Sequence, residues 1–389
     1  MINKKILAII RRHDYLINMD FFDYLNWRGD LSFEKVPFNK VDALLLAHVT
    51  YSIFDRVVPE TFDKRKTFAQ VAKDFSSSPD YEERINIGFL INKRTAELMF
   101  KCAECERYRN VELCGFRNIY DEGNVEQFAA VTYLIDGKPV IALRGTDDTI
   151  VGWKEDFNIA WQPQIPAQKD ALEYFEEAAA AFDSKLILTG HSKGGNLVIN
   201  TAVKCEKKLQ DRIEAVYNFD GPGFPKEFFK MKEYKAVEER IFSFYPGFSV
   251  VGMIFHHPKK FEIVESNGFA FWQHDAMNWQ IMGGNFVNVG SFTDESRIFY
   301  KAFNEWVDRL DTEQKKNFVE TMFCILEASG AKTNSDIEKD PLKSSAKMLA
   351  AYAEMDKKRR KELRKIISMF KDVISDDIPI FKPLTLLKK

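Results

Sequence analysis

The stretch LILTGHSKGGNLVINTAV, residues 186–203, decides the fold. Its apolar beginning predicts a buried strand, and its second half has the apolar spacing of a helix. Between them, residues 190–194 fit G-x-S-x-G, a sharp strand-to-helix turn that exposes a serine hydroxyl. Glycines at both ends of this motif let strand and helix approach closely, because glycine has no Cβ. The stretch therefore makes Ser192 a candidate nucleophile.

Strands and helices alternate on both sides of this turn. Two β-rich apolar runs within residues 125–143 are separated by Asp136-Gly137, which predicts a hairpin. Further strands are predicted at IEAVYNFD, ERIFSFYP and KKFEIVESN, with amphipathic helices between the earlier ones. This alternation predicts an α/β fold with a mostly parallel sheet and crossover helices.

The pattern divides the chain into three parts. Residues 1–110 predict three or four helices and form a candidate cap, and residues 111–290 carry the α/β core. Residues 291–389 return to helical spacing. We therefore expect helical additions at both ends of the core.

Composition and charge restrict the class of partner. The chain has 45% hydrophobic and 29% charged residues and a net charge of −2, so nothing favours nucleic acid. No stretch approaches the roughly 20 apolar residues of a membrane span. The short N-terminal apolar run is interrupted by Arg11 and Arg12, unlike a signal peptide. A cytoplasmic protein is expected.

The basic run MDKKRRKELRKI is typical of a solvated helix face, with peripheral membrane contact as the alternative.

Cysteines and phenylalanines each allow a functional and a plain interpretation. Cys102 and Cys105 resemble half of a metal site and Cys114 lies nearby, but no second pair or histidine cluster follows. We expect no metal and no cofactor. The 34 phenylalanines fit core filling better than an aromatic cleft for an acyl chain, which is the functional alternative.

Two blocks carry a resemblance to a known family. IALRGTDDTIVGWKEDF followed by LILTGHSKGGNLV resembles the class 3 lipase pattern within the α/β-hydrolase fold. With EQFAAVTYLIDG, SVVGM and QHDAMNWQ added, roughly residues 85–285 most resemble the Mbeg-like proteins, a bacterial lipase-related family of unknown physiological role. The resemblance implies an α/β-hydrolase fold with helical N- and C-terminal additions.

The resemblance also suggests an oxyanion hole. In class 3 lipases the residue after Arg-Gly lies in that hole, and here it is Thr146. The amides of Thr146 and Lys193 would hold the oxyanion, with the Thr146 hydroxyl as a candidate third donor. Asp156 is expected to pair with Arg144 and brace the hole. The side chain of Lys193 is expected to be solvated at the start of its helix, with binding of an anionic substrate as the alternative.

A catalytic serine needs a base, and chain order in this fold is serine, acid, histidine. Three histidines follow Ser192, at positions 256, 257 and 274. His274 follows the last predicted strand, where the fold delivers its base, and its Gln-His-Asp setting matches the Mbeg-like pattern. We predict His274 as the base and keep His257 as the alternative.

The position of the triad acid departs from the class 3 lipase pattern. In class 3 lipases it follows the strand that matches IFSFYP, and Ser249 stands there instead. A serine cannot balance an imidazolium by charge. Asp220, at the end of the preceding strand, is our leading candidate, because open α/β sheets place their sites at the carboxyl ends of strands. Ser249 as a neutral acceptor, or no acid at all, remain alternatives, and Asp275 would need an unusual bend to reach His274.

These residues predict a serine hydrolase that cleaves carboxylic esters, with lipid esters as one candidate class. The alternative is an inactive hydrolase-fold protein that binds an acyl-like ligand or a protein partner, which the serine at position 249 favours. Acyl transfer to an acceptor other than water would use the same residues.

Overall fold

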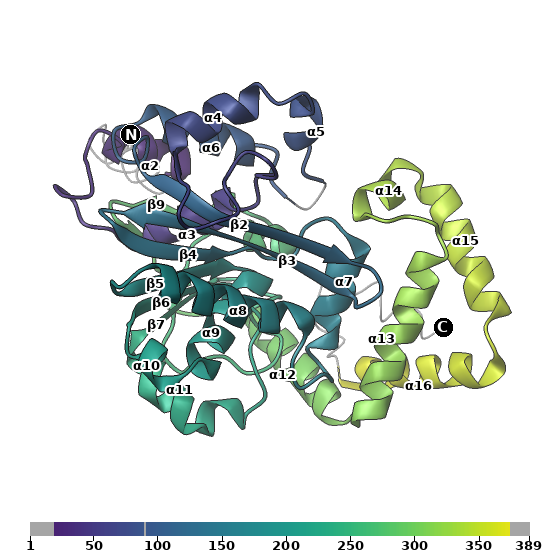
Figure 1. Ribbon diagram of the computed structural model, residues 1–389. Coiled ribbons are helices and arrows are strands. Elements are labelled where there is room, and N and C mark those ends of the chain that lie inside the picture. The colour runs from purple at the N-terminus through teal and green to yellow at the C-terminus, as the bar shows by residue number, and fades with distance from the viewer. Residues whose placement is uncertain (1–18, 89–90, 374–389) are drawn as a thin grey trace, which may run out of the picture.

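The computed structural model describes residues 19–88 and 91–373 (Figure 1). The expectation about a signal peptide concerns residues that lie outside these ranges. No helix in the described ranges has the length and apolar character needed to cross a bilayer. The N-terminal part consists of α2 (Phe21–Arg28), α3 (Lys40–Val49), β1 (Lys66–Thr67), α4 (Phe68–Ser76), α5 (Tyr81–Arg84) and α6 (Thr95–Glu104).

An eight-stranded sheet forms the centre of the molecule. After β1 it contains β2 (Glu112–Asp121), β3 (Glu126–Ile135), β4 (Lys138–Leu143), β5 (Leu186–His191), β6 (Ile213–Phe219), β7 (Ile241–Pro246) and β8 (Glu262–Val264). Strands follow one another in sequence order; those from β1 to β4 pair antiparallel and those from β4 to β8 pair parallel. The predicted hairpin and the mostly parallel sheet are thereby confirmed.

Helices cover both faces of the sheet. The crossover helices are α7 (Ile150–Asn158), α8 (Pro166–Ala181), α9 (Lys193–Lys204), α10 (Lys207–Gln210) and α11 (Lys232–Val237). One hydrophobic core lies between the sheet and α8, α9 and α11. The other lies between the sheet and the N-terminal helices, and α3 is buried in it from Val41 to Val49 (Figure 1). The sheet thus lies between two layers of helices, with the strand–turn–helix at β5 and α9. This arrangement is an α/β-hydrolase fold, as predicted.

The C-terminal part is helical and extends away from the sheet (Figure 1). A small two-stranded sheet, β9 (Ile281–Met282) and β10 (Asn285–Phe286), precedes it. The helices are α12 (Asp294–Asp308), α13 (Thr312–Glu327), α14 (Asn334–Lys339), α15 (Pro341–Glu354) and α16 (Lys357–Val373). A core around Trp306 and Ile366 joins α12 to α16.

The long strand β2 was not predicted from the sequence, and its irregularity explains why. Gly115 has φ +63°, and the pairing with β3 shifts between Cys114 and Arg117. A bulge of this kind interrupts the period-two alternation by which a half-buried strand is recognised. A Cβ on Gly115 would also lie 2.3 Å from the ring of Phe62, so the position requires glycine.

Candidate active site

Ser192 occupies a strained turn between β5 and α9. Its φ of 58° and ψ of −132° are rare for a residue with a side chain. The turn is held by hydrogen bonds from the Ser192 amide to the Phe219 carbonyl (2.9 Å) and from the Gly195 amide to the Ser192 carbonyl (2.8 Å). A Cβ on Gly190 would lie 2.2 Å from the carbonyl oxygen of Gly194, so β5 and α9 meet at glycine as the motif predicted.

His274 and Asp220 are brought together from separate loops. His274 ends a short 3-10 helix (Ala270–His274), and Asp220 directly follows β6. Nδ1 of His274 lies 2.6 Å from Oδ2 of Asp220, whose side chain is fully buried. Asp220 itself has φ 48°, and its amide donates to the carbonyl of Phe244 (2.8 Å). The neighbouring strand β7 therefore fixes the carboxylate that faces the imidazole.

Ser249 contacts the carboxylate and not the imidazole. Its Oγ donates to Oδ1 of Asp220 at 2.6 Å, and the residue is buried. The two oxygens of Asp220 are therefore divided between Ser249 and His274. The expected alternative, Ser249 as an acceptor for the histidine, does not match this placement.

The other candidate histidines lie elsewhere. Nδ1 of His256 is 2.9 Å from the hydroxyl of Tyr300, and Nδ1 of His257 is 3.2 Å from the carbonyl of Pro258. Neither lines the cavity that contains Ser192, whereas His274 does. Asp275 is directed to Asn92, whose amide nitrogen lies 2.8 Å from Oδ2.

Thr146 lies beside Ser192 because Gly145 packs directly on the turn. A Cβ on Gly145 would be 2.9 Å from Cβ of Ser192 and 2.1 Å from the hydroxyl of Tyr51. Thr146 and Lys193 both line the cavity at Ser192. The hydroxyl of Thr146, however, donates to the carboxylate of Asp156. Because a hydroxyl has only one proton, the expectation that this hydroxyl is a third oxyanion donor is wrong for this structure.

Arg144 and Asp156 do not form the expected pair. Nη2 of Arg144 contacts Asp147 (3.1 Å) and Asn118 (3.3 Å) instead. Asp156 is half-buried at the wall of the cavity, and desolvation there raises its pKa to about 6. Asp156 therefore braces the loop through the Thr146 hydroxyl, and Arg144 braces it from the opposite side.

The side chain of Lys193 is buried, not solvated as expected. Its Nζ donates to Oε2 of Glu155 (2.8 Å) and to the carbonyl and Oε1 of Gln127 (2.6 and 2.9 Å). Both members of the Lys193–Glu155 pair have fully buried side chains. Glu155 also accepts the amide of Gln127 (3.1 Å), so the pair joins the start of α9 to α7 and β3. The position of a lysine at a helix start predicts a solvated side chain, but it does not reveal a buried carboxylate on another helix.

Two residues that the sequence did not single out connect the parts of the site. Nε2 of His191 lies 2.8 Å from the carbonyl of His274, and its Nδ1 lies 3.2 Å from the hydroxyl of Tyr51. Burial and the two neighbouring histidines, His274 and His48, keep the pKa of His191 well below its ordinary value. The neutral ring has one N–H, which must be on Nε2 because a carbonyl only accepts.

Tyr51 completes this connection. Burial raises the pKa of its hydroxyl, which therefore keeps its proton and donates to Nδ1 of His191. The same hydroxyl packs against Gly145, where a Cβ would lie 2.1 Å from it. A chain of hydrogen bonds thus runs from Tyr51 through His191 to the backbone of His274, and packing on Gly145 joins Tyr51 to the loop of Thr146. No local motif marks Tyr51, because its role depends on contacts distant in sequence.

Ser192 and His274 open into an apolar cavity of about 490 Å³. Aromatic side chains dominate its wall, and the C-terminal helices supply many of them. Seven of the 34 phenylalanines line it, so the aromatic-cleft interpretation applies to a minority and core filling to most of the rest. The side chains contributed by α12, α13 and α16 are Phe299, Phe303, Trp306, Phe318, Ile367 and Phe370.

A family profile described as Mbeg1-like matches residues 102–324, more than half of the chain. The chain belongs to the Mbeg1-like family. Among solved structures it is similar to M37 lipase, at 14% identity over 56% of this chain and 70% of the lipase, with a TM-score of 0.36. It is also similar to a triacylglycerol lipase from Penicillium expansum, at 12% identity over 46% and 86% of the two chains, with a TM-score of 0.31. No curated protein matches it.

The Mbeg1-like match covers Ser192, Asp220, Ser249 and His274 but not the whole site. Tyr51 and the cavity wall from α16 lie outside the matched residues. Tyr51, one member of the hydrogen-bonded chain, and part of the apolar wall are therefore contributed by segments that flank the family's region.

The cysteines show no metal-binding arrangement in the part of the chain that the structure describes, where no cluster of three or more histidine, cysteine or carboxylate ligands is found. Cys102 is buried in the N-terminal core, and burial raises the pKa of its thiol.

Proposed function

We propose that this protein is a serine hydrolase that cleaves carboxylic esters through an acyl-enzyme on Ser192. The observation that carries the proposal is the 2.6 Å contact between Nδ1 of His274 and the buried carboxylate of Asp220, in a cavity that also contains Ser192. A histidine oriented by a carboxylate is what an alcohol nucleophile needs as its base. The strained turn at Ser192 supports the same role.

The proposed reaction proceeds in two halves. Nε2 of His274 accepts the Ser192 proton as Oγ attacks the ester carbon, and Asp220 stabilises the imidazolium through Nδ1–H. The amides of Thr146 and Lys193 donate to the oxyanion. The tetrahedral intermediate collapses, and the imidazolium gives its proton to the departing alcohol. Water then attacks the acyl-enzyme with His274 again as base, which releases the acid and restores Ser192.

The lining of the apolar cavity indicates that it holds the acyl part of the ester. Phenylalanine, tryptophan and isoleucine side chains line about 490 Å³ beside Ser192, a volume suited to an acyl chain. Burying each methylene of that chain contributes up to about 0.8 kcal/mol. We therefore propose esters of medium or long acyl chains, lipid esters included, as the substrate class.

Turnover of p-nitrophenyl esters of graded acyl length tests the proposal. We expect kcat/KM to rise from acetyl to octanoyl esters and to fall by at least about 1,000-fold in Ser192→Ala and His274→Ala proteins. Binding of the octanoyl ester without turnover in the unaltered protein would instead favour the ligand-binding alternative. Transfer of the acyl group to an added alcohol in preference to water would favour acyl transfer.

A further inference from the structure

The mouth of the apolar cavity is itself apolar. Three residues line that cavity and are also exposed at the surface: Phe157 of α7, Trp272 of the 3-10 helix that ends at His274, and Ile367 of α16. Phe269 directly precedes that 3-10 helix, its carbonyl accepts the Trp272 amide, and its side chain is 85% exposed. Large apolar side chains exposed together mark an interaction site. We call these four residues the apolar rim.

The helix that contributes Ile367 to the rim is strongly basic. α16 contains eight lysines and arginines against two carboxylates, a net charge of +6, whereas the whole chain has a net charge of −2. Its apolar side packs in the C-terminal core, where the carbonyl of Ile366 accepts the indole N–H of Trp306 at 3.0 Å (Figure 1). The charges of α16 therefore lie on the sides turned away from that core.

Ile367 lies at the border between the apolar and the charged side of α16. At about 100° per residue, Ile366 lies on one side of Ile367. The residues within about 120° on the other side include Lys357, Arg360, Lys361, Arg364 and Lys371, which we call the basic face. The basic face therefore begins directly at the mouth of the cavity.

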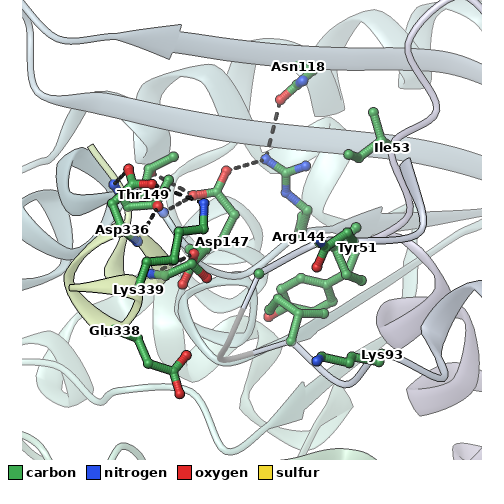
Figure 2. A pocket seen from close by; sticks show the side chains of 17 residues that line it. Tyr51, Ile53, Lys93, Asn118, Arg144, Asp147, Thr149, Asp336, Glu338 and Lys339 are labelled. Atoms are coloured by element: carbon green, nitrogen blue, oxygen red, sulfur yellow. Dashed lines mark hydrogen bonds and ion pairs between the residues drawn. The ribbon is translucent and has the colours of Figure 1, made fainter. Parts of the chain in front are cut away.

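Charged groups elsewhere around the site are paired, whereas the basic face is not. Figure 2 shows Arg144 between Asp147 and Asn118, at 3.1 and 3.3 Å. In the part of the chain that the structure describes, no residue of the basic face forms an ion pair. Arg364 donates to a neutral hydroxyl, that of Tyr352, at 2.7 Å. The positive charge of this face is thus available to an anionic partner.

We propose that the apolar rim and the basic face dock this protein on the surface of an anionic lipid bilayer. Phe269 and Trp272 enter the interface, which favours aromatic side chains, and the basic face contacts lipid phosphates. The rim favours a bilayer over a nucleic acid, because only the bilayer offers an apolar phase. The cavity mouth then faces the membrane, from which the ester reaches Ser192. This delivery of the ester rests on the proposed function, whereas the docking does not.

Co-sedimentation of the Ser192→Ala protein with sucrose-loaded vesicles tests the docking without turnover. One set of vesicles is phosphatidylcholine alone, and the other contains about one third phosphatidylglycerol, an anionic lipid. Each lysine or arginine near an anionic surface strengthens partitioning by about fivefold, so we expect at least about 100-fold stronger partitioning onto the anionic vesicles. High salt should remove most of that difference by screening. Equal partitioning onto the two kinds of vesicle would overturn the proposal.

The basic face is tested by removing its three exposed cations together, in a Lys357→Gln, Lys361→Gln, Arg364→Gln protein. Partitioning onto the anionic vesicles should fall by roughly 100-fold. Partitioning onto the neutral vesicles should change by less than about threefold, because the lost attraction is to anionic lipid. A loss of the same size on both kinds of vesicle would contradict a charge-dependent face.

The matched control removes the same number of charges from another part of the surface. Lys208→Gln, Lys230→Gln and Lys232→Gln lie in and near α10 and α11, far from α16 in Figure 1, and their side chains are at least 75% exposed. Partitioning should stay within about threefold, because charges far from the surface are screened. A loss as large as that of the first triple variant would show that only net charge matters, and the docking surface would be wrong.

The apolar rim has its own pair of variants. Phe269→Ser and Leu342→Ser each replace a side chain that is 85% exposed, but only Phe269 belongs to the rim. Phe269→Ser should weaken partitioning onto both kinds of vesicle by about 10-fold, because apolar area no longer leaves water. Leu342→Ser should leave partitioning unchanged. Equal effects of the two variants would refute insertion of the rim and with it the proposal.

Two further results separate the alternatives. Binding of a DNA duplex through the basic face, without binding of vesicles, would overturn the bilayer in favour of a nucleic acid. With Ser192 intact, loss of the basic face should leave turnover of dissolved p-nitrophenyl butanoate unchanged and slow the turnover of a vesicle-borne ester in proportion to the bound fraction. Vesicle binding by a protein that hydrolyses neither ester would refute the proposed function and leave the docking surface standing.

Discussion

Oγ of Ser249 lies 2.6 Å from Oδ1 of Asp220, while Oδ2 of the same carboxylate faces His274 at 2.6 Å. Ser249 stands where the class 3 lipase resemblance led us to expect the acid. Its contact with Asp220 means that the loop after β7 and the loop after β6 contribute to one unit: a carboxylate from β6 and a hydroxyl that holds it.

This arrangement predicts unequal effects of substitution at the two positions. Asp220→Asn should keep the shape but lose the orienting charge, and kcat should fall by about 10⁴-fold. Ser249→Ala removes one hydrogen bond to a charged group, worth about 1.5–3 kcal/mol at most, so kcat should fall by no more than about 10- to 100-fold. Steady-state kinetics with an octanoyl ester measures both. A larger loss for Ser249→Ala than for Asp220→Asn would contradict the assignment.

The hydrogen-bonded chain through Tyr51 predicts a positioning effect. Tyr51→Phe keeps the ring but removes the hydroxyl between Gly145 and His191. We expect kcat to fall by roughly 5-fold, because about 1 kcal/mol of orientation is lost. KM should be nearly unchanged, because the Tyr51 ring that lines the apolar cavity is kept. The pH dependence of kcat should shift as well, since the ring that contacts the His274 backbone is released. A change confined to thermal stability would show that Tyr51 is only structural.

The buried pair of Lys193 and Glu155 predicts a large effect on stability. Lys193→Met leaves an uncompensated buried carboxylate, so the free energy of unfolding should fall by about 3–5 kcal/mol. The double variant Lys193→Met with Glu155→Gln removes the stranded charge and should recover part of that loss. Urea denaturation of the three proteins makes the comparison. Equal destabilisation of the single and double variants would contradict the ion-pair explanation.

The raised pKa of Asp156 predicts that the free energy of unfolding depends on pH. Burial raises its pKa to about 6, against about 3.9 in an unfolded chain. Between about pH 4 and 6 the folded protein thus binds more protons than the unfolded chain, so Asp156 lowers the free energy of unfolding as pH rises. Asp156→Asn keeps an oxygen for the Thr146 hydroxyl but cannot ionise. Its advantage over the unaltered protein should grow to about 3 kcal/mol by pH 7. An advantage that does not vary with pH would refute this.

The sheet was predictable because its signals are local. The Asp136-Gly137 hairpin and the glycine-flanked turn at Ser192 depend on a few adjacent residues, and both match the structure. The strand at residues 112–121 was missed because a bulge at Gly115 disrupts its alternation.

Partners of charged groups were less predictable, because they are decided by packing between distant segments. Arg144 was expected on Asp156 and lies on Asp147, and Lys193 was expected in water and is buried with Glu155. Tyr51 had no signal at all, since it reaches His191 across 140 residues of sequence. Chain order did, by contrast, bring Asp220 forward as a candidate before its contact with His274 was known.

Reaction of the purified protein with a fluorophosphonate tests the central claim most directly. The reagent forms a covalent phosphonyl ester only with a serine activated by a base. Intact-mass and peptide analysis should show one adduct per chain on Ser192. That adduct should be absent in Ser192→Ala and should form far more slowly in His274→Ala and Asp220→Asn. An unmodified Ser192 in the folded protein, even with detergent present to admit the reagent to the apolar cavity, would contradict an activated nucleophile and with it the proposed hydrolase.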